Sequence, residues 1–155
     1  MNKFPIRTAT KAIIIKEGKI LLNKYNNGKN IWYTFPGGGQ DHNEDLKSNL
    51  KRECLEEMGA DVEVLDVLFV REFIADNHNP SPSRTGYHQV NIIFECYLID
   101  ENFVKPSQPD PNQIGVEWVK IDELLNYNLY PLSIRKDIIE HYTGNNNKIY
   151  LGETD

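Results

Sequence analysis

The segment from Pro36 to Ala60 constrains the fold of this chain most, because it joins a run of glycines to an acid-rich helical pattern. Its sequence is PGGGQDHNEDLKSNLKRECLEEMGA. Four apolar residues recur at every fourth position, namely Leu46, Leu50, Cys54 and Met58. This spacing predicts a helix that buries one stripe of side chains. Gly59 comes next, and a glycine at this place is typical of the residue that ends a helix.

Acidic side chains gather on the same predicted helix. Glu53, Glu56 and Glu57 stand at positions i, i+3 and i+4, which are neighbours on one helix face. Like charges placed in this way repel one another, and Lys51 and Arg52 offset only part of the repulsion. A divalent cation would relieve it. Carboxylates suit Mg²⁺ or Mn²⁺, which keep several water ligands and are usually completed by substrate phosphates, so the pattern points towards phosphate chemistry.

The glycines before the helix add a second part to the predicted site. Glycine lets the backbone approach a ligand closely and adopt positive φ angles. A backbone carbonyl of the run from Gly37 to Gly39 could therefore join the metal ligands. Each feature also has an ordinary interpretation, because an acidic patch is often a solvated helix face and Pro-Gly-Gly is often a plain turn. Their occurrence together, in register, favours a site.

The polar and glycine residues of this segment follow a fixed spacing. In order they are Gly38, five residues, Glu44, seven residues, then Arg52, Glu53, Cys54, Glu56, Glu57, Gly59 and Ala60. This order resembles the signature box of the Nudix hydrolases at every specified position. The resemblance implies an α/β fold of the Nudix type, an α/β/α sandwich with a mixed sheet in which the box forms a loop and a helix. It also implies an enzyme.

The resemblance assigns roles to the box residues. Four of them are implied as metal ligands, the carboxylates of Glu53, Glu56 and Glu57 and the backbone carbonyl of Gly37. The implied cofactor is Mg²⁺, with Mn²⁺ as a substitute. Two further residues complete the implied catalytic group: Arg52 would orient a box glutamate by ion pairing, and Glu44 would support the metal ligands.

Two roles in the site stay open at this stage. A carboxylate must take a proton from the attacking water, and Glu53 is the first candidate and Glu57 the second, with Glu95 or Glu117 as alternatives outside the box. Where many relatives have a further acidic ligand, this chain has Asn112 and Gln113.

Substrate contacts are expected from the glycines of the box loop and from a polar loop later in the chain. Gly38 and Gly39 are candidates for backbone contacts, and Arg84 and His78, in the loop from 75 to 86, could reach a phosphate or a base. An ordinary solvated loop is the alternative for these two side chains. Trp32 is expected in the core, with stacking on a base as the alternative.

The whole chain sets further bounds. Its 155 residues fit one domain, so a single Nudix domain is expected over residues 1–155. The formal net charge of −6 argues against a nucleic-acid partner. No run is long and apolar enough for a membrane span, and Met1 to Ala9 has no apolar leader, so the expected location is the cytoplasm. Cys54 and Cys96 lie in apolar runs and are expected to be buried thiols. A homodimer is a further expectation from the family.

The rest of the chain predicts strands and one more long helix. Strands are expected over residues 8–16, 19–25, 31–35, 61–74, 87–100, 115–121 and 149–151, with polar loops over 75–86 and 102–112. A bend is expected near Asp66, and on the 87–100 strand one alternating face is expected to be buried. Asp122 is expected to cap a short helix that ends at Asn126. Pro131 is expected at the start of the last helix, from Leu132 to Tyr142.

The implied reaction is hydrolysis of the pyrophosphate linkage in a nucleoside diphosphate joined to another moiety. The small nucleotide is expected to be a nucleoside triphosphate or a nucleotide sugar, because downstream markers of the ADP-ribose, dinucleoside polyphosphate and NADH hydrolases have no counterpart here. Two alternatives remain. One is a nucleotide-binding sensor on the same fold that does not turn substrate over, and the other is an acidic structural domain that binds Ca²⁺.

Overall fold

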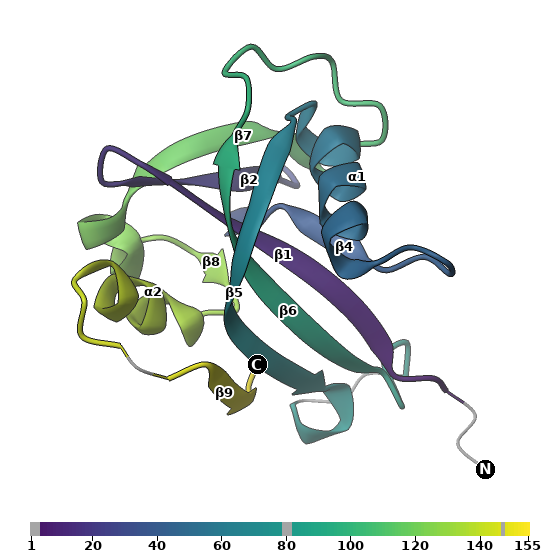
Figure 1. Cartoon of the computed structure of the whole chain (residues 1–155). Coiled ribbons are helices and arrows are strands. Elements are labelled where there is room, and N and C mark those ends of the chain that lie inside the picture. Colours follow the sequence, from purple (N-terminus) through teal and green to yellow (C-terminus); the bar gives the residue numbers. More distant parts are fainter. Residues whose placement is uncertain (1–3, 79–81, 147) are drawn as a thin grey trace.

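The computed structural model describes residues 4–78, 82–146 and 148–155. In the described residues the elements run, in order, β1 (Arg7–Lys16), β2 (Lys19–Asn26), β3 (Ile31–Thr34), β4 (Gly37–Gly39), α1 (Leu46–Met58), β5 (Val62–Ile74), η1 (Ala75–Asn77), β6 (His88–Leu98), β7 (Gln113–Lys120), η2 (Ile121–Asn126), β8 (Leu129–Tyr130), α2 (Ile134–Tyr142) and β9 (Tyr150–Glu153). The two η elements are short 3-10 helices. Figure 1 shows their arrangement.

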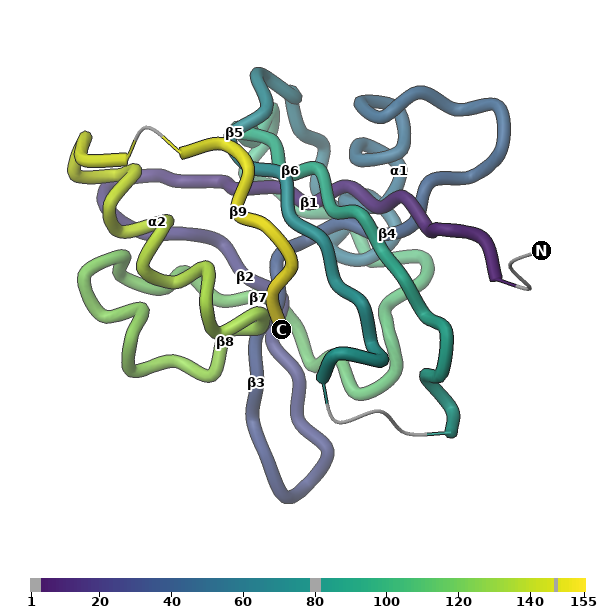
Figure 2. The backbone as a smooth tube through the Cα atoms, turned by 90° about the horizontal axis from the view of Figure 1, so that it is seen from below, coloured from purple at the N-terminus to yellow at the C-terminus, as the bar shows by residue number. Residues whose placement is uncertain are grey.

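The strands form a mixed, curled sheet whose two halves meet at the β1–β2 hairpin. The order is β8-β3-β2-β1-β6-β5-β9, with β4 paired to β1 and β7 paired to β2. β1 is parallel to β6 and antiparallel to β4, whereas it pairs with β2 only next to the hairpin turn. The two halves therefore diverge from the hairpin. In the tube view the β2–β3 hairpin projects from the rest of the molecule (Figure 2).

Helices cover the sheet on opposite sides, and each side has its own hydrophobic core. α1 packs Leu50, Cys54 and Met58 against side chains of β1, β5 and β6. On the other side, Ile134 and Ile138 of α2 pack with side chains of η2, β2, β3 and β5 (Figure 1). The layers are helix, strands, helix, which confirms the expected α/β/α sandwich. Among the described residues, no helix has the length and apolarity needed to cross a membrane.

The box helix forms as the sequence predicts. α1 begins after Asp45, whose carboxylate accepts a hydrogen bond from the Ser48 amide at 2.8 Å and so satisfies one of the free N–H groups of the first turn. It ends at Gly59, which has a φ of 69°. A side chain there would also collide with the Val104 carbonyl, so glycine is required twice. Cys54 is a buried free thiol, as is Cys96, and both expectations are confirmed.

The expected strands are present, and two short strands that the sequence did not predict, β4 and β8, are added to them. β5 is one strand, and its pairing with β6 shifts register between Val64 and Phe69, which confirms the bend near Asp66. On β6 the predicted face is buried at Phe94 and Cys96. Asn91 and Ile93, on the opposite face, are buried as well. Both faces of this part of the sheet are covered, so alternation alone did not predict which residues face water.

Three local predictions are wrong at element boundaries. The last helix begins at Ile134, because Leu129–Tyr130 is still extended and pairs with β3, so the chain needs a turn at Pro131 before it can become helical. Asp122 does not cap a helix. It lies in the first turn of η2, which starts one residue earlier at the buried Ile121. The 75–86 loop begins with the short η1, and its residues 79–81 lie outside the described residues.

Candidate active site

The glycine strand β4 joins the box helix to the sheet. Gly37, Gly38 and Gly39 pair with Lys11, Thr10 and Ala9 of β1. The amide of Asn49, a buried residue of α1, donates to the Gly39 carbonyl at 2.8 Å. In turn the Thr10 hydroxyl donates to the Asn49 side-chain oxygen at 2.5 Å. These bonds fix the first half of α1 against β1 and β4.

Two of these glycines are required by their surroundings. The φ of Gly37 is 132°, and a Cβ there would meet the backbone of Thr10. A Cβ on Gly38 would lie 2.5 Å from the carboxyl carbon of Glu53. The carboxylate of Glu53 is therefore held directly over the glycine strand. The sequence expectation that the loop and the helix acids form one site agrees with this geometry.

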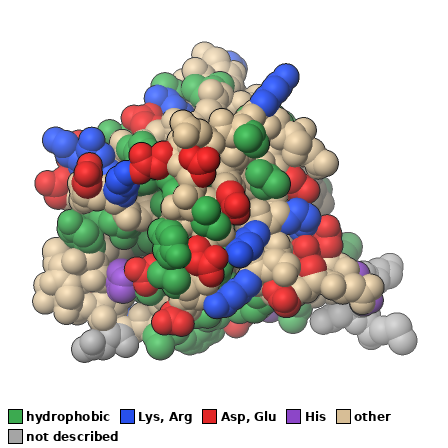
Figure 3. Space-filling view, turned by 45° about the horizontal axis from the view of Figure 1, so that its top comes forward, with side chains coloured by type: hydrophobic (Ala, Val, Ile, Leu, Met, Phe, Trp, Pro, Cys, Tyr) green, Lys and Arg blue, Asp and Glu red, His purple; other side chains and the backbone are tan. Residues whose placement is uncertain are grey.

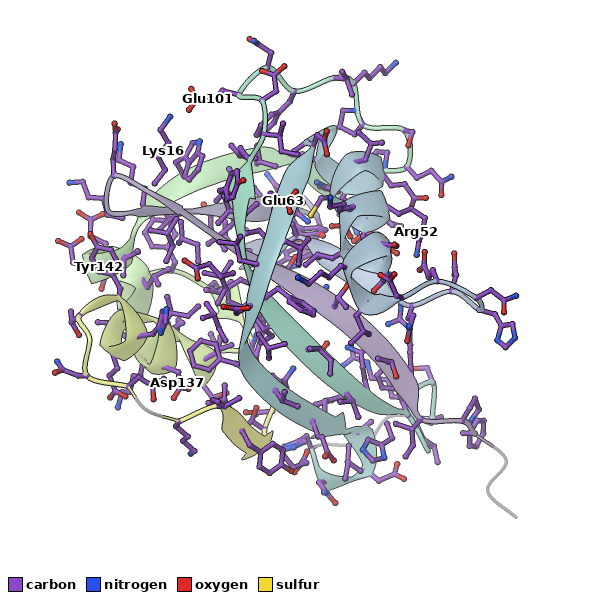
Figure 4. The ribbon with its side chains drawn as sticks, in the orientation of Figure 1. Lys16, Arg52, Glu63, Glu101, Asp137 and Tyr142 are labelled. Carbon is purple, nitrogen blue, oxygen red and sulfur yellow. The ribbon has the colours of Figure 1, made fainter. Side chains whose placement is uncertain are left out.

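Arg52 connects three acids of the box. Its Nη2 and Nε bind the two carboxylate oxygens of Glu44 at 2.7 and 3.0 Å. Its Nη1 binds Glu53 and Glu56, each at 3.1 Å. The hydrogen bonds from Arg52 lower the pKa of Glu44 to about 2 and keep it charged. Arg52 projects from α1 in Figure 4.

Glu57 is the most buried acid of the helix, with 4% of its surface exposed. Its Oε2 accepts hydrogen bonds from the Asn23 amide at 2.9 Å and from the Gly37 backbone N–H at 3.0 Å. Burial raises its pKa to about 7, although Lys11 and the two hydrogen bonds oppose this rise. The buried Oδ1 of Asn23 has no hydrogen-bond partner in the described residues. Such an unpaired acceptor beside a carboxylate is unusual in a folded protein.

Two more charged groups reach this region from outside the box. Lys11 of β1 donates to the Gly37 carbonyl at 2.9 Å. Burial lowers the pKa of Lys11, and the negative charges of Glu57, Asp110 and Glu53 counteract the effect. Asp110 comes from the loop between β6 and β7, where its carboxylate accepts a hydrogen bond from the Tyr25 hydroxyl at 3.0 Å.

A cavity of about 760 Å³ is lined by residues of several strands and loops, with Lys11 of β1 among them. Its wall combines aromatic residues, amides and cations: Trp32, Phe35, Phe73, Asn91, Gln89, Asn128, Lys11, Arg71 and Arg84, among others. Lys11 belongs both to this wall and to the contact with Gly37, so the cavity and the box glutamates are adjacent. Cavities that bind small molecules commonly have this size, and polar residues outnumber apolar ones in the lining of this cavity.

A family model described as "NUDIX domain" matches residues 5–140 of the chain. The chain belongs to the NUDIX family. The expected resemblance is confirmed, and with it the expectation of a Nudix hydrolase, at the level of the family.

Solved structures of Nudix proteins have the same fold. A Nudix hydrolase from Nitrosomonas europaea superposes with a TM-score of 0.72 at 18% identity, covering 91% of each chain. An ADP-ribose pyrophosphatase from Streptococcus suis 89-1591 gives 0.63 at 23% identity, over 97% of this chain and 100% of that one. A MutT Nudix hydrolase from Burkholderia pseudomallei gives 0.66 at 23% identity, over 88% and 99%. At these identities the likeness establishes the fold.

Nudix hydrolases generally use divalent metal ions, and the donors present here suit one in their chemistry. Glu53, Glu56 and Glu57 provide hard carboxylate oxygens, and Gly37 provides a backbone carbonyl. The side-chain oxygen of Asn23, which has no hydrogen-bond partner in the described residues, lies beside Glu57, so a polar ligand fits there. In the described residues no three acidic, histidine or cysteine side chains converge as a ready ligand set. Arg52 holds two of the glutamates instead, so metal binding requires these carboxylates to turn.

The structure separates the remaining candidates. Glu95 is exposed on β6 and does not line the cavity. Glu117 pairs with Lys24 at 2.6 Å and accepts from the Tyr33 hydroxyl, and the bond to Lys24 lowers its pKa. Glu117 is thereby engaged in a structural contact.

The structure also gives the surroundings of His78, His88 and Arg84. His88 pairs with Glu72 and His78 with Glu153, so both have structural partners at the far end of the sheet. Arg84 is exposed and lines the cavity. This position is compatible with the expected contact to a substrate.

Four site residues were not singled out from the sequence: Lys11, Asn23, Asn49 and Asp110. A signal was present for the first two, because each is a polar side chain next to an apolar run in its strand, Ala12 to Ile15 for Lys11 and Ile20 to Leu22 for Asn23. Buried polar residues are rare without a partner or a function. Trp32 is half-buried, stacks on Tyr25 at 5.3 Å and lines the cavity, so its expected place in the core is only half right.

Proposed function

We propose that this protein hydrolyses the pyrophosphate linkage of a nucleoside diphosphate joined to another group, with Mg²⁺ as its cofactor and Mn²⁺ as a substitute. The observation that carries the proposal is the link between the box glutamates and a cavity of about 760 Å³. Lys11 lines this cavity and donates to the carbonyl of Gly37, whose amide binds Glu57. The reacting diphosphate would lie over the glutamates while the nucleoside lies in the cavity. The substrate class is a nucleoside triphosphate or a small nucleotide sugar.

The metal would be held by Glu53, Glu56, Glu57 and the carbonyl of Gly37. When bound, it would polarise phosphoryl oxygens and make a water ligand more acidic. α1 is fixed at both ends, and the carboxylates of Glu53 and Glu56 would turn from their bonds with Arg52 towards the metal. The Oε2 of Glu57 accepts hydrogen bonds from the Asn23 side chain and the Gly37 amide, so its Oε1 is the oxygen left for a ligand.

Glu53 is the proposed proton acceptor for the attacking water. Burial raises its pKa, although the neighbouring Arg52 opposes this, and a raised pKa makes a carboxylate a stronger base near neutral pH. Glu44 keeps the guanidinium of Arg52 in place and is a positioning residue in this scheme.

The cavity provides the nucleoside site of the proposal. Trp32 and Phe73 offer aromatic faces on which a base can stack. Asn91 is buried at the cavity wall with 2% of its surface exposed, and its Oδ1 already accepts from the Gln89 amide at 2.7 Å. Its amide nitrogen is then available as a donor for a base edge. Arg71 is held by Thr154 and adds positive charge to the same wall.

The experiment is product analysis by mass spectrometry in ¹⁸O-labelled water, with Mg²⁺ and a panel of nucleoside triphosphates, nucleotide sugars, ADP-ribose, NADH and dinucleoside polyphosphates. Wild type should release a nucleoside monophosphate, and the label identifies the phosphorus that was attacked. Glu53→Gln should lose the activity. Glu95→Gln makes the same chemical change on the exposed face of β6 and should remain fully active.

A panel in which nothing is cleaved would overturn the proposal. Nucleotides that still bind under those conditions would instead support the alternative, a nucleotide-binding sensor on the Nudix fold. Loss of activity in Glu95→Gln with activity retained in Glu53→Gln would move the proton acceptor to β6.

A further inference from the structure

Lys11 stands at the boundary between the two parts of the site. Its Nζ donates to the Gly37 carbonyl at 2.9 Å, and the amide of the same glycine binds Glu57 at 3.0 Å. Lys11 also lines the cavity. A ligand that fills the cavity and extends to the glutamates therefore has to pass this ammonium group.

The position of Lys11 in its strand is costly for a charged residue. Its neighbours Thr10 and Ala12 are fully buried, and Lys11 itself is only partly exposed. An ammonium removed from water needs hydrogen bonds and counter-charge to be tolerated. It has three N–H donors, and in the described residues the Gly37 carbonyl is the single protein acceptor that Nζ reaches. Two donors remain for a ligand.

Other cations around the site differ from Lys11 in their partners. Arg52 is saturated by Glu44, Glu53 and Glu56. Lys24 is paired with Glu117. Lys11 has no carboxylate within ion-pair distance in the part of the chain that the structure describes, and feels its acidic neighbours only from further away.

Charge balance indicates what Lys11 would bind. In the metal-free protein the charges of Glu57 and Glu53 support the ammonium. These carboxylates act from beyond ion-pair distance and offer Nζ no acceptor atom. A phosphate at the boundary supplies both the charge and the acceptor oxygens for the two spare N–H groups.

We propose that Lys11 binds the nucleoside-proximal phosphate directly, as a protein cation fixed between the cavity and the box glutamates. The proposal rests on the proposed function in taking the ligand to be a nucleotide. It adds a substrate-binding residue that lies outside the box, on β1. Gly37 orients Lys11 through its carbonyl and Glu57 through its amide, so one glycine residue positions both groups.

The test compares binding of nucleoside monophosphates with binding of the matching nucleosides, by calorimetry in EDTA so that no metal contributes. The probes are AMP, GMP, CMP and UMP with their nucleosides. Wild type should prefer the monophosphate by roughly tenfold or more, as expected for a charge-assisted hydrogen bond. Lys11→Met should lose this preference and keep its nucleoside affinity within about threefold, a margin well under 1.4 kcal/mol.

Lys16→Met is the matched control. Lys16 lies at the other end of β1 and pairs with Glu101 on the surface (Figure 4), so this variant makes the same change of charge away from the site. It should behave as wild type. Lys11→Arg keeps the cation and should keep part of the preference. If Lys11→Met does not melt cooperatively, Lys11→Gln supplies the comparison, since it keeps a donor for Gly37.

Three results would overturn the proposal. The first is a phosphate preference that survives in Lys11→Met or is missing from wild type. In the second, the variant loses nucleoside and monophosphate affinity equally, which would make Lys11 a support of the cavity wall. In the third, Lys11→Met binds Mn²⁺ more tightly, as measured by electron paramagnetic resonance, and its preference for the monophosphate is unchanged. Lys11 would then compete with the metal for the Gly37 carbonyl. Because none of these readouts needs turnover, a failure of the proposed hydrolysis would be seen separately.

Discussion

Arg52 and Glu44 form a two-point ion pair, in which Nη2 lies 2.7 Å from Oε1 and Nε lies 3.0 Å from Oε2. The planar guanidinium matches both carboxylate oxygens at once and still has Nη1 free for the two glutamates further along the helix. A lysine has a single charged nitrogen and cannot make these contacts together.

Arg52→Lys should therefore fold and lose activity by roughly 10- to 100-fold, the usual effect of removing a residue that orients metal ligands. The pKa of Glu44, held at about 2 by Arg52, should rise towards its ordinary value. Carboxyl NMR of labelled glutamate measures this rise directly. An unchanged Glu44 pKa in a fully active variant would remove Arg52 from its role.

Glu57→Gln should stabilise the metal-free protein at alkaline pH. Glu57 titrates near 7 in the folded chain, above its ordinary value of 4.5, so the folded state binds more protons than the unfolded state between these values. Wild-type stability should then fall as pH rises from about 4.5 to 7 and stay lower above 7. The advantage of the variant should be on the order of 3 kcal/mol at pH 8 and vanish near pH 4.

Urea denaturation in EDTA at several pH values measures the Glu57 effect. The groups facing Glu57 are Lys11, Asp110 and Asn23, and the substitution also removes the negative charge that raises the pKa of Lys11. Activity with metal should fall by orders of magnitude in the same variant. A difference in stability that does not depend on pH would contradict the assigned titration.

Leu50→Ala should act through stability alone. Leu50 is fully buried under α1, and removing its side chain should cost roughly 2–5 kcal/mol. Leu55→Ala is the control on the same helix, because Leu55 is 47% exposed and should change stability by about 0.5 kcal/mol or less. Chemical denaturation measures both. Equal losses in the two variants would show that the helix buries a different face.

Trp32 should report on nucleoside binding by its fluorescence. It lines the cavity, whereas Trp118 packs on the α1 side of the sheet. Nucleotide should quench the emission of wild type and of Trp118→Phe, and the quenching should disappear in Trp32→Phe. Quenching that follows Trp118 instead would place the nucleoside on the other face.

Local patterns in the sequence predicted the parts of this structure that depend on neighbouring residues. The box helix is set by an apolar stripe, an aspartate at its start and a glycine at its end, all within one segment. The β1–β2 hairpin likewise follows from a Glu17-Gly18 turn between two apolar runs, both of which form the expected strands. The acids of the site lie on that one helix, so their grouping could be predicted with it.

The parts that were not predicted depend on residues far apart in the chain. Lys11 meets Gly37 across 26 positions, and Asn23 meets Glu57 across 34. Asn91 is buried because both faces of the sheet are covered there, which no single strand pattern encodes. The late start of α2 has the same origin, since β8 first has to pair with β3. A polar residue next to an apolar run in its strand was the one available sign.

The loop from 99 to 112 closes the end of the box helix. Val104 donates its amide to the Gly59 carbonyl, and the Gln108 amide and the Gln113 side chain donate to the carbonyls of Glu56 and Glu57. The peptide groups of two proposed metal ligands are thus tied to a surface segment outside the box. Ligand binding should be visible there as slower hydrogen exchange at Val104 and Gln108. Substitutions in this loop can therefore change the positions of the glutamates without replacing any of them.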